Sequence, residues 1–147
     1  MRYSVNIEIN APIDEVVKRF DDPTKMKEWM PGLVSFEAIE GEPGQVGAKS
    51  KLVFQMGKRT VEMIETITVR DLPARFDGNY VAKGVYNEVG NAFEAKDANT
   101  TIYTSEQFFD FKGGMKIIGW LFPKTFKKSS YKYLQDFKAF VERDYTA

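Results

Sequence analysis

The sequence predicts an α+β fold in which one antiparallel sheet packs a face against a long C-terminal helix. Apolar and polar residues alternate through residues 2–10 and through much of 33–111, which is typical of strands with one buried face. From residue 123 to about 143 the apolar residues instead recur at steps of three and four, as they do on one face of an α-helix. The predicted order is one strand, two helices, six strands and the long helix.

The first part of the chain contains a strand, two short helices and the start of a second strand. The strand at 2–10 ends before Pro12, which suits the first turn of a helix because a proline there loses no hydrogen bond. That helix ends at the Asp-Asp-Pro sequence of 21–23, and a second short helix is expected over 23–28. The next strand is expected over 33–39.

Short turns divide the following region into antiparallel strands. Their Gly, Pro, Asn and Asp residues are typical of tight turns, and they lie at 41–47, at 57–59, at 71–75, near Gly84 and at 96–101. The pair Asp77-Gly78 is an alternative hairpin signal. The turn near Gly84 is preferred because the alternative leaves a strand of only about four residues. After the last strand, 113–122 is expected to form a short helix and Pro123 to begin the long one.

Composition limits the chemistry. The 147 residues fit a single domain, residues 1–147, and the 21 basic and 21 acidic residues give no overall charge that would attract nucleic acid. The absence of cysteine and histidine excludes disulfides, thiolate nucleophiles, Cys/His metal sites and histidine acid–base catalysis. We therefore expect no metal and no cofactor. The alternating N-terminus lacks a signal-peptide core and no run is long enough to span a membrane, so we expect a cytoplasmic protein.

Two stretches of the sequence combine several motifs. The first is INAPIDEVVKRFDDPTKMKEWMPGLVSFEAIEGEPGQVGAKSKLVF, with Ala-Pro and an acidic residue at the first helix, an Asp-Pro break, Trp-x-Pro and a Gly-rich hairpin before a long strand. The second is the closing FKGGMKIIGWLFPKTFKKSSYKYLQDFKAFVE. The first stretch resembles the opening, and the second the C-terminal helix, of the START-related SRPBCC superfamily, to which polyketide cyclase/dehydrase-like and plant pollen-allergen-like proteins belong.

The resemblance implies the helix-grip fold. In this fold a curved antiparallel sheet of about seven strands wraps around the long C-terminal helix, two short helices follow the first strand, and ligands bind in an apolar cavity between sheet and helix. The catalytic members of the superfamily differ in their residues, and no catalytic set transfers to this chain.

One carboxylate interrupts an otherwise apolar strand. In TVEMIETITV (60–69), Glu65 shares a predicted face with four apolar residues, Val61, Met63, Ile67 and Val69. A buried, unpaired carboxylate is costly, so Glu65 is expected to find a partner, to face a wet cavity, or to lie at a bulge that turns it outward. Two interpretations stay open: contact with a bound ligand, or pairing with a neighbouring strand or with water.

The main functional hypothesis is the binding of a hydrophobic or amphipathic small molecule, such as a lipid, an isoprenoid or a polyketide-like compound, in a cavity between the sheet and the C-terminal helix. A pocket of this kind is mostly apolar with a few fixed polar groups. Strand parity and helix face predict these ligand-binding residues: Phe54, Met56, Met63, Glu65, Tyr80, Asn91, Phe93, Tyr103, Phe126, Tyr133 and Phe137.

Two alternatives come from other classes of protein. A polyketide cyclase/dehydratase-like enzyme would use Glu65 for proton transfer, with Tyr80, Tyr103 or Asn91 polarising a carbonyl group. A protein-partner module, like the stress-related and chaperone-activating relatives, would make contact through a sheet edge or through GWLFP (119–123).

The segment KIIGWLFPKTFKK (116–128) has two interpretations. Apolar residues beside lysines are found on helices that touch anionic membranes. More often such residues cover a core while the lysines are solvated, and this second interpretation is preferred. For Trp29, too, packing is preferred: it is expected to hold the short helices against the sheet edge rather than to line a cavity.

Overall fold

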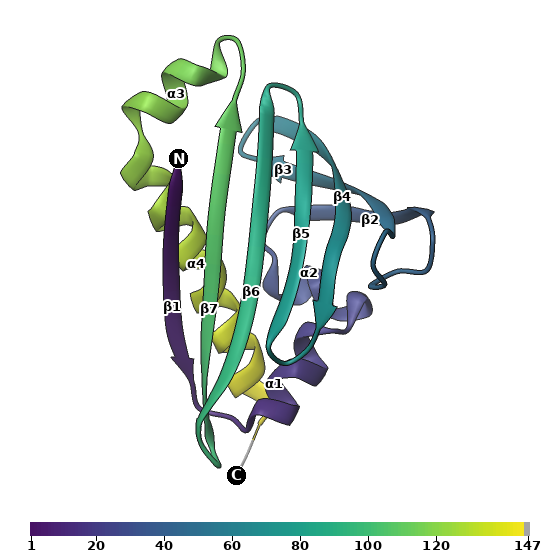
Figure 1. Cartoon of the computed structure of the whole chain (residues 1–147), viewed down its shortest axis with the longest axis vertical. Coiled ribbons are helices and arrows are strands. Elements are labelled where there is room, and N and C mark those ends of the chain that lie inside the picture. Colours follow the sequence, from purple (N-terminus) through teal and green to yellow (C-terminus); the bar gives the residue numbers. More distant parts are fainter. Residues whose placement is uncertain (146–147) are drawn as a thin grey trace.

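Seven antiparallel strands form one curved sheet in the computed structural model of the chain, which describes residues 1–145 (Figure 1). The strand order is β1-β7-β6-β5-β4-β3-β2, so β2 to β7 follow one another and β1 joins at the β7 edge. The strands are β1 (Arg2–Ile9), β2 (Leu33–Glu40), β3 (Lys49–Met56), β4 (Arg59–Asp71), β5 (Arg75–Ala82), β6 (Val85–Asp97) and β7 (Thr100–Phe111).

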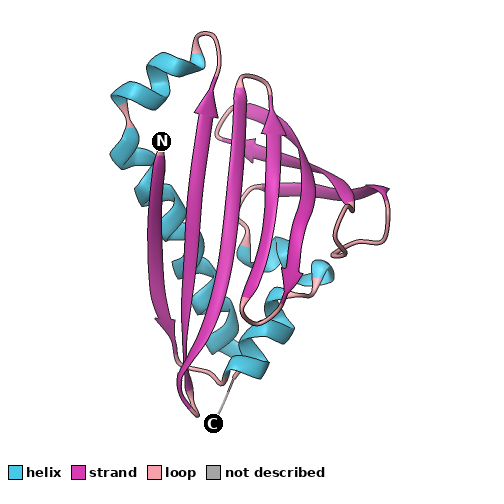
Figure 2. Ribbon diagram, viewed as in Figure 1, coloured by secondary structure: helices cyan, strands magenta, loops and turns pink. Residues whose placement is uncertain are grey.

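The helices follow β1 and β7, as the sequence predicts (Figure 2). They are α1 (Ile13–Phe20), a 3-10 turn (Pro23–Lys25), α2 (Met26–Trp29), α3 (Met115–Leu121) and α4 (Pro123–Asp144). Figure 1 shows α4 running behind β1 and β7. The Tyr3 hydroxyl of β1 lies 2.6 Å from the Ser130 hydroxyl of α4, which fixes the helix along this edge. Among the helices of residues 1–145, none is long and apolar enough to cross a membrane.

The fold is therefore the predicted helix-grip arrangement, a curved sheet with a long C-terminal helix on one side. We call the face toward α4 the inner face and the opposite one the outer face. The preferred turn is also confirmed: β5 and β6 pair on either side of Gly84, whereas Asp77 and Gly78 lie within β5. Gly84 has a φ of +76°, and a Cβ there would lie 2.9 Å from Cγ of Met115.

Five aromatic side chains fill the inner side of the sheet beneath the short helices, and we call them the aromatic core: Phe20, Trp29, Phe93, Tyr103 and Phe137. The three closest ring pairs have centroids 4.6 to 4.9 Å apart, one stacked and two edge-on. Trp29 is buried, as expected for a packing residue. Its ring packs against Phe20 of α1 and Phe137 of α4, and it shares a buried cluster with Val5 and Ile9 of the edge strand β1.

A β-bulge ends the apolar stripe of β4 earlier than the alternation predicts. The register shifts between Ile67 and Val69, so that the extra residue, Thr68, has no partner on β5. Val69 consequently turns outward and is 37% exposed, although the alternation placed it on the inner face. Arg70 turns inward instead, above the ring of Phe76, and it binds Asp21 through two hydrogen bonds.

Candidate functional site

Glu65 lies on the inner face and pairs with a tyrosine. It stands directly opposite Tyr80 of β5, so both side chains leave the sheet on the same side. The Tyr80 hydroxyl donates a hydrogen bond of 2.6 Å to Oε2 of Glu65. Glu65 is only 7% exposed. Of the three outcomes expected for Glu65, the structure therefore has the first, a partner. The bulge begins beyond it and leaves its direction unchanged.

The surroundings shift the proton equilibria of this pair. Burial raises the pKa of Glu65, and the hydrogen bond from Tyr80 offsets part of that rise. Burial and the negative charge of Glu65 together raise the pKa of Tyr80 well above its ordinary value. The Tyr80 hydroxyl therefore keeps its proton and remains a hydrogen-bond donor. Glu65 is a carboxyl group that takes up a proton more readily than an exposed one, and it can accept or donate a hydrogen bond.

The pair belongs to a polar row that runs straight across four strands. In the sheet register Ser50 of β3 faces Glu65, Glu65 faces Tyr80, and Tyr80 faces Asn87 of β6. Ser50 and Glu65 are buried, whereas Tyr80 and Asn87 keep part of their surface exposed. We call these four residues the polar row. It lies beside the buried apolar cluster of Leu33, Leu52 and Phe54, which Met63 and Tyr80 join.

Helix α4 brings a further hydroxyl toward this row. The pKa of Tyr80 is also raised by Tyr103 of β7 and Tyr133 of α4, so these phenols lie near it. Tyr133 is partly exposed, and burial raises its own pKa. The structure thus brings together, from four different elements, five of the residues that the sequence predicts: Met63, Glu65, Tyr80, Tyr103 and Tyr133.

A hydrogen-bonded chain continues the polar surface toward β7. Asn87 Nδ2 donates to Oε1 of Gln107 at 3.1 Å, and Gln107 Nε2 donates to the Ser105 hydroxyl at 2.8 Å. The predicted residue Asn91 donates to the Phe76 carbonyl at 3.0 Å and accepts from the Tyr103 hydroxyl at 2.6 Å.

Sequence reasoning missed two buried hydroxyl groups, Ser50 within the polar row and Ser105 on β7. Both could have been found by strand parity. Ser50 alternates with Leu52 and Phe54, and Ser105 alternates with Tyr103.

The other predicted residues lie elsewhere on the inner side. Phe93 and Phe137 belong to the aromatic core, and Phe54 packs with Leu33 and Leu52. Phe126 packs at a tilt against Phe109 and Phe111, with ring centroids 5.3 and 5.2 Å away. Met56, at the end of β3, is 56% exposed. A ligand contact by these residues stays a prediction.

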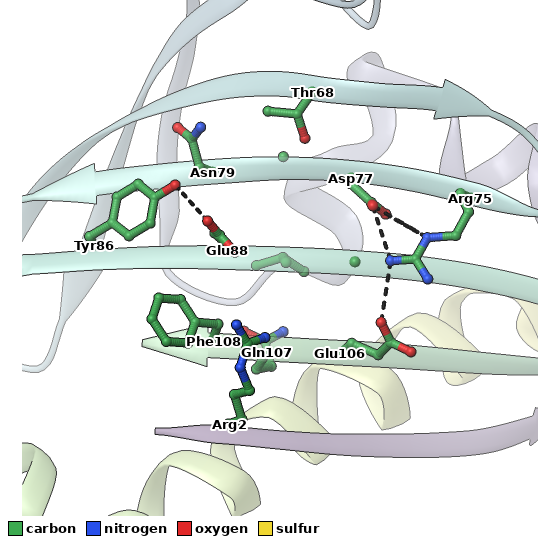
Figure 3. Close-up of a pocket in the computed structure, with 13 residues that line it drawn as sticks. Arg2, Thr68, Arg75, Asp77, Asn79, Tyr86, Glu88, Glu106, Gln107 and Phe108 are labelled. Atoms are coloured by element: carbon green, nitrogen blue, oxygen red, sulfur yellow. Dashed lines mark hydrogen bonds and ion pairs between the residues drawn. The ribbon is translucent and has the colours of Figure 1, made fainter. Parts of the chain in front are cut away.

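A hollow of about 330 Å³ lies on the outer face, away from Glu65 (Figure 3). Three of its charged groups pair with one another, because Arg75 lies 3.0 Å from Asp77 and 3.2 Å from Glu106. Gly90 leaves room for this guanidinium, since a Cβ there would lie 2.5 Å from Nη2 of Arg75. The hollow is therefore lined in part by a surface ion-pair network, and it lies on the face of the sheet opposite Glu65.

A second hollow, of about 260 Å³ between α1 and α4, is lined mainly by charged side chains, among them Glu15, Lys18 and Arg19. Within residues 1–145, no group of three or more acidic side chains is placed to hold a metal ion.

Comparison with known proteins assigns the chain to a family. No curated protein matches the chain. Among solved structures, a protein from Thermus thermophilus (15% identity, 99% of this chain and 100% of that one) has a TM-score of 0.80. A conserved protein from Geobacillus kaustophilus (17% identity, 99% and 98%) has a TM-score of 0.81. The Zhui aromatase/cyclase from Streptomyces sp. R1128 (14% identity, 100% and 96%) has a TM-score of 0.78.

At these identities the solved structures establish the helix-grip fold alone. The family follows from a match to the sequence itself. The model of the family described as "Polyketide cyclase / dehydrase and lipid transport" matches residues 1–142. The chain therefore belongs to the polyketide cyclase/dehydrase and lipid transport family of the SRPBCC superfamily.

Proposed function

We propose that the protein binds a hydrophobic or amphipathic small molecule, of the lipid, isoprenoid or polyketide-like class, between the inner face of the sheet and α4. The observation that carries this proposal is the polar row, in which a buried carboxyl–phenol pair lies beside a buried apolar cluster. Small-molecule sites combine an apolar wall with a few oriented polar groups in this way.

Incomplete burial around the polar row supports the same location. Tyr80 lies deep enough for burial to raise its pKa strongly, yet its side chain keeps accessible surface. Met63, Gln107 and Tyr133 also face inward and are also partly exposed. Inward-facing side chains that retain accessible surface border space that the protein's own atoms do not fill.

The chemistry of the row suggests which end of a ligand it would bind. Glu65 with its raised pKa and the Tyr80 hydroxyl form a compact donor–acceptor pair, which fits a hydroxyl, a phenol or a carbonyl group. Met63 and the neighbouring Leu52 and Phe54 offer apolar surface to the remainder. An amphipathic molecule with one uncharged polar end satisfies both requirements.

Native mass spectrometry of the protein purified from cells, followed by solvent extraction and identification of what it carries, tests the proposal. We expect an apolar or amphipathic compound, displaced by an uncharged fluorescent probe such as aminoanthracene. Glu65→Gln should weaken binding of hydroxyl-bearing ligands about tenfold, since a hydrogen bond to a charged group contributes about 1.5–3 kcal/mol. No co-purifying compound together with no probe uptake would refute the proposal.

A second candidate function, cyclase/dehydratase-like catalysis, rests on Glu65 alone. A buried carboxyl with a raised pKa, next to a phenol donor, is suited to move one proton in a folded reactive chain. The similarity to an aromatase/cyclase concerns the fold and gives this candidate a substrate class to test. Turnover of β-keto substrates by wild type and Glu65→Gln distinguishes the two functions, because a binding protein shows no turnover in either form.

A further inference from the structure

Two inward contacts fix how α3 is turned on the end of the sheet. Gly119 faces the protein so closely that a Cβ there would lie 2.3 Å from Cδ2 of Phe111. One helical turn earlier, Met115 contacts Gly84 of the β5–β6 turn. Residues at i and i+4 share one face of a helix. The face with Met115 and Gly119 therefore packs on the sheet, and the opposite face points away from the molecule.

That opposite face is apolar. Ile117, Trp120 and Leu121 follow the i, i+3, i+4 spacing and are 62%, 80% and 53% exposed, and Phe122 beside them is 51% exposed. The expectation that this segment covers the core is therefore wrong for these four residues, although Phe126 further on does pack inward. In Figure 1, α3 lies at one end of the molecule, beyond the N-terminal end of β1.

Positive charge surrounds this apolar face. Residues 111–135 contain no aspartate or glutamate and six lysines, which are Lys112, Lys116, Lys124, Lys127, Lys128 and Lys132, in a chain whose net charge is zero. All six are exposed. Within residues 1–145, only Lys132 of these six forms an ion pair, with Asp136. The remaining charge of the chain is correspondingly negative and lies elsewhere.

We propose that α3 and the first turn of α4 form a docking surface for an anionic lipid membrane. We call this surface the α3 surface, made of Ile117, Trp120, Leu121 and Phe122 with the five unpaired lysines. The apolar side chains would enter the boundary between headgroups and acyl chains, while the lysines contact anionic headgroups. Trp120 suits that depth because indole rings concentrate at membrane–water interfaces.

Charge complementarity favours a membrane over a second copy of the chain. A symmetric dimer through this surface would bring two lysine-rich surfaces together, and like charges repel. An anionic membrane offers negative charge beneath all the lysines and an apolar layer for Trp120 at the same time. The inference rests on exposure and charge, and it holds whether or not the proposed ligand site is correct.

Vesicle co-sedimentation tests the inference, with liposomes of phosphatidylcholine alone and of equal parts phosphatidylcholine and phosphatidylserine. We expect binding to the anionic vesicles only, weakened by added salt because exposed charges are screened. The triple change of Lys124, Lys127 and Lys128 to Gln should lower the partition coefficient about 100-fold, since each lysine contributes roughly fivefold. Trp120→Ala should lower it about tenfold.

Matched controls exclude general effects of charge and hydrophobicity. The triple change of Lys18, Lys27 and Lys58 to Gln removes the same charge from positions outside the α3 surface and should change binding less than about threefold. Val46→Ala removes an exposed apolar side chain from the loop between β2 and β3, outside the α3 surface, and should leave vesicle binding unchanged. Trp120 fluorescence should shift to the blue on binding, and Trp120→Phe should abolish the shift while retaining most of the affinity.

Three results would overturn the inference. One is the absence of binding to anionic vesicles at low salt. Another is binding that the α3-surface variants and the control variants reduce equally. The third is concentration-dependent dimerisation in sedimentation analysis that Trp120→Ala abolishes, because the α3 surface would then be covered by a second copy.

Discussion

The inner side of the sheet has two regions that are filled differently, the aromatic core and the polar row. The aromatic core is closed: Phe137 has no exposed surface, and Phe93 and Tyr103 are almost as deeply buried. The polar row combines a buried ionisable pair with side chains that remain partly exposed. Strand β6 contributes to both regions, Phe93 to the aromatic core and Asn87 to the polar row, but the two regions differ in what covers them.

The short helices explain the difference. Phe20 of α1 and Trp29 of α2 pack against the rings of Phe93 and Phe137, and these contacts close the core. Within residues 1–145, no corresponding aromatic contact lies over Glu65 and Tyr80. One region therefore stabilises the fold, while the other would, in the proposed function, present polar groups beside apolar surface to a ligand. Substitutions in the two regions should separate stability from binding.

The largest effect is expected for Phe137→Ala in the aromatic core. Removing a fully buried phenyl ring should lower the free energy of unfolding by about 3–5 kcal/mol, because transfer and cavity costs add. Chemical denaturation measures the change, and Leu121→Ala, an exposed apolar truncation on α3, serves as the control, with an expected change within about 0.5 kcal/mol. Equal losses in the two variants would mean that the core is not closed as described.

Tyr80→Phe should have a smaller effect on stability. The variant leaves Glu65 without its hydrogen-bond donor, which should cost about 1–3 kcal/mol when the carboxylate is ionised. Below the ordinary pKa of a glutamate the carboxyl is neutral in both the folded and the unfolded chain, so the loss should shrink there. Urea unfolding at acidic and neutral pH measures this. The structurally similar change Tyr86→Phe, on the outer face, should cost little at either pH. A loss in Tyr80→Phe that does not vary with pH would contradict the role of the pair.

Glu65→Gln should change mainly the pH dependence of stability. Burial raises the pKa of folded Glu65 above its ordinary value of 4.5, so the folded protein retains a proton that the unfolded chain has released. The free energy of unfolding of the wild type should therefore fall as pH rises from the ordinary to the raised pKa and stay level above it. Glutamine cannot ionise, and the variant should gain stability relative to the wild type over that range. Parallel pH profiles for the two proteins would show that the pKa of Glu65 is not raised.

Much of the fold could be predicted because local signals agree with the overall architecture. Alternation marks the strands, and Pro12 and Pro123 mark helix starts. The choice of Gly84 over Asp77-Gly78 depended only on reasonable strand lengths. The bulge at Thr68 could not be predicted, because no glycine marks it and its effect is a register shift between two strands.

The sequence predicts which side chains of the site point toward the inner face, but it does not predict which residues they contact there. Parity indicates that Glu65 and Tyr80 point inward, yet their pairing depends on the register between β4 and β5. Whether an inward-facing residue is buried depends on which other elements pack over it, and these are distant in the sequence. Phe137 and Tyr133, for example, lie one turn apart on α4, but Phe137 is buried and Tyr133 is partly exposed. The exposure of Trp120 likewise follows from the close packing of Gly119 on Phe111, which periodicity does not reveal.

The most direct test of the proposed binding region is methyl NMR of the six methionines during titration with aminoanthracene. Met63 packs beside Tyr80, whereas Met56 is exposed at the end of β3 and Met115 lies on α3. We expect the Met63 methyl resonance to shift with saturable dependence on probe concentration, while Met56 and Met115 stay in place. Saturable binding by fluorescence that leaves the Met63 methyl unmoved would place the ligand elsewhere and contradict the proposed location beside the polar row.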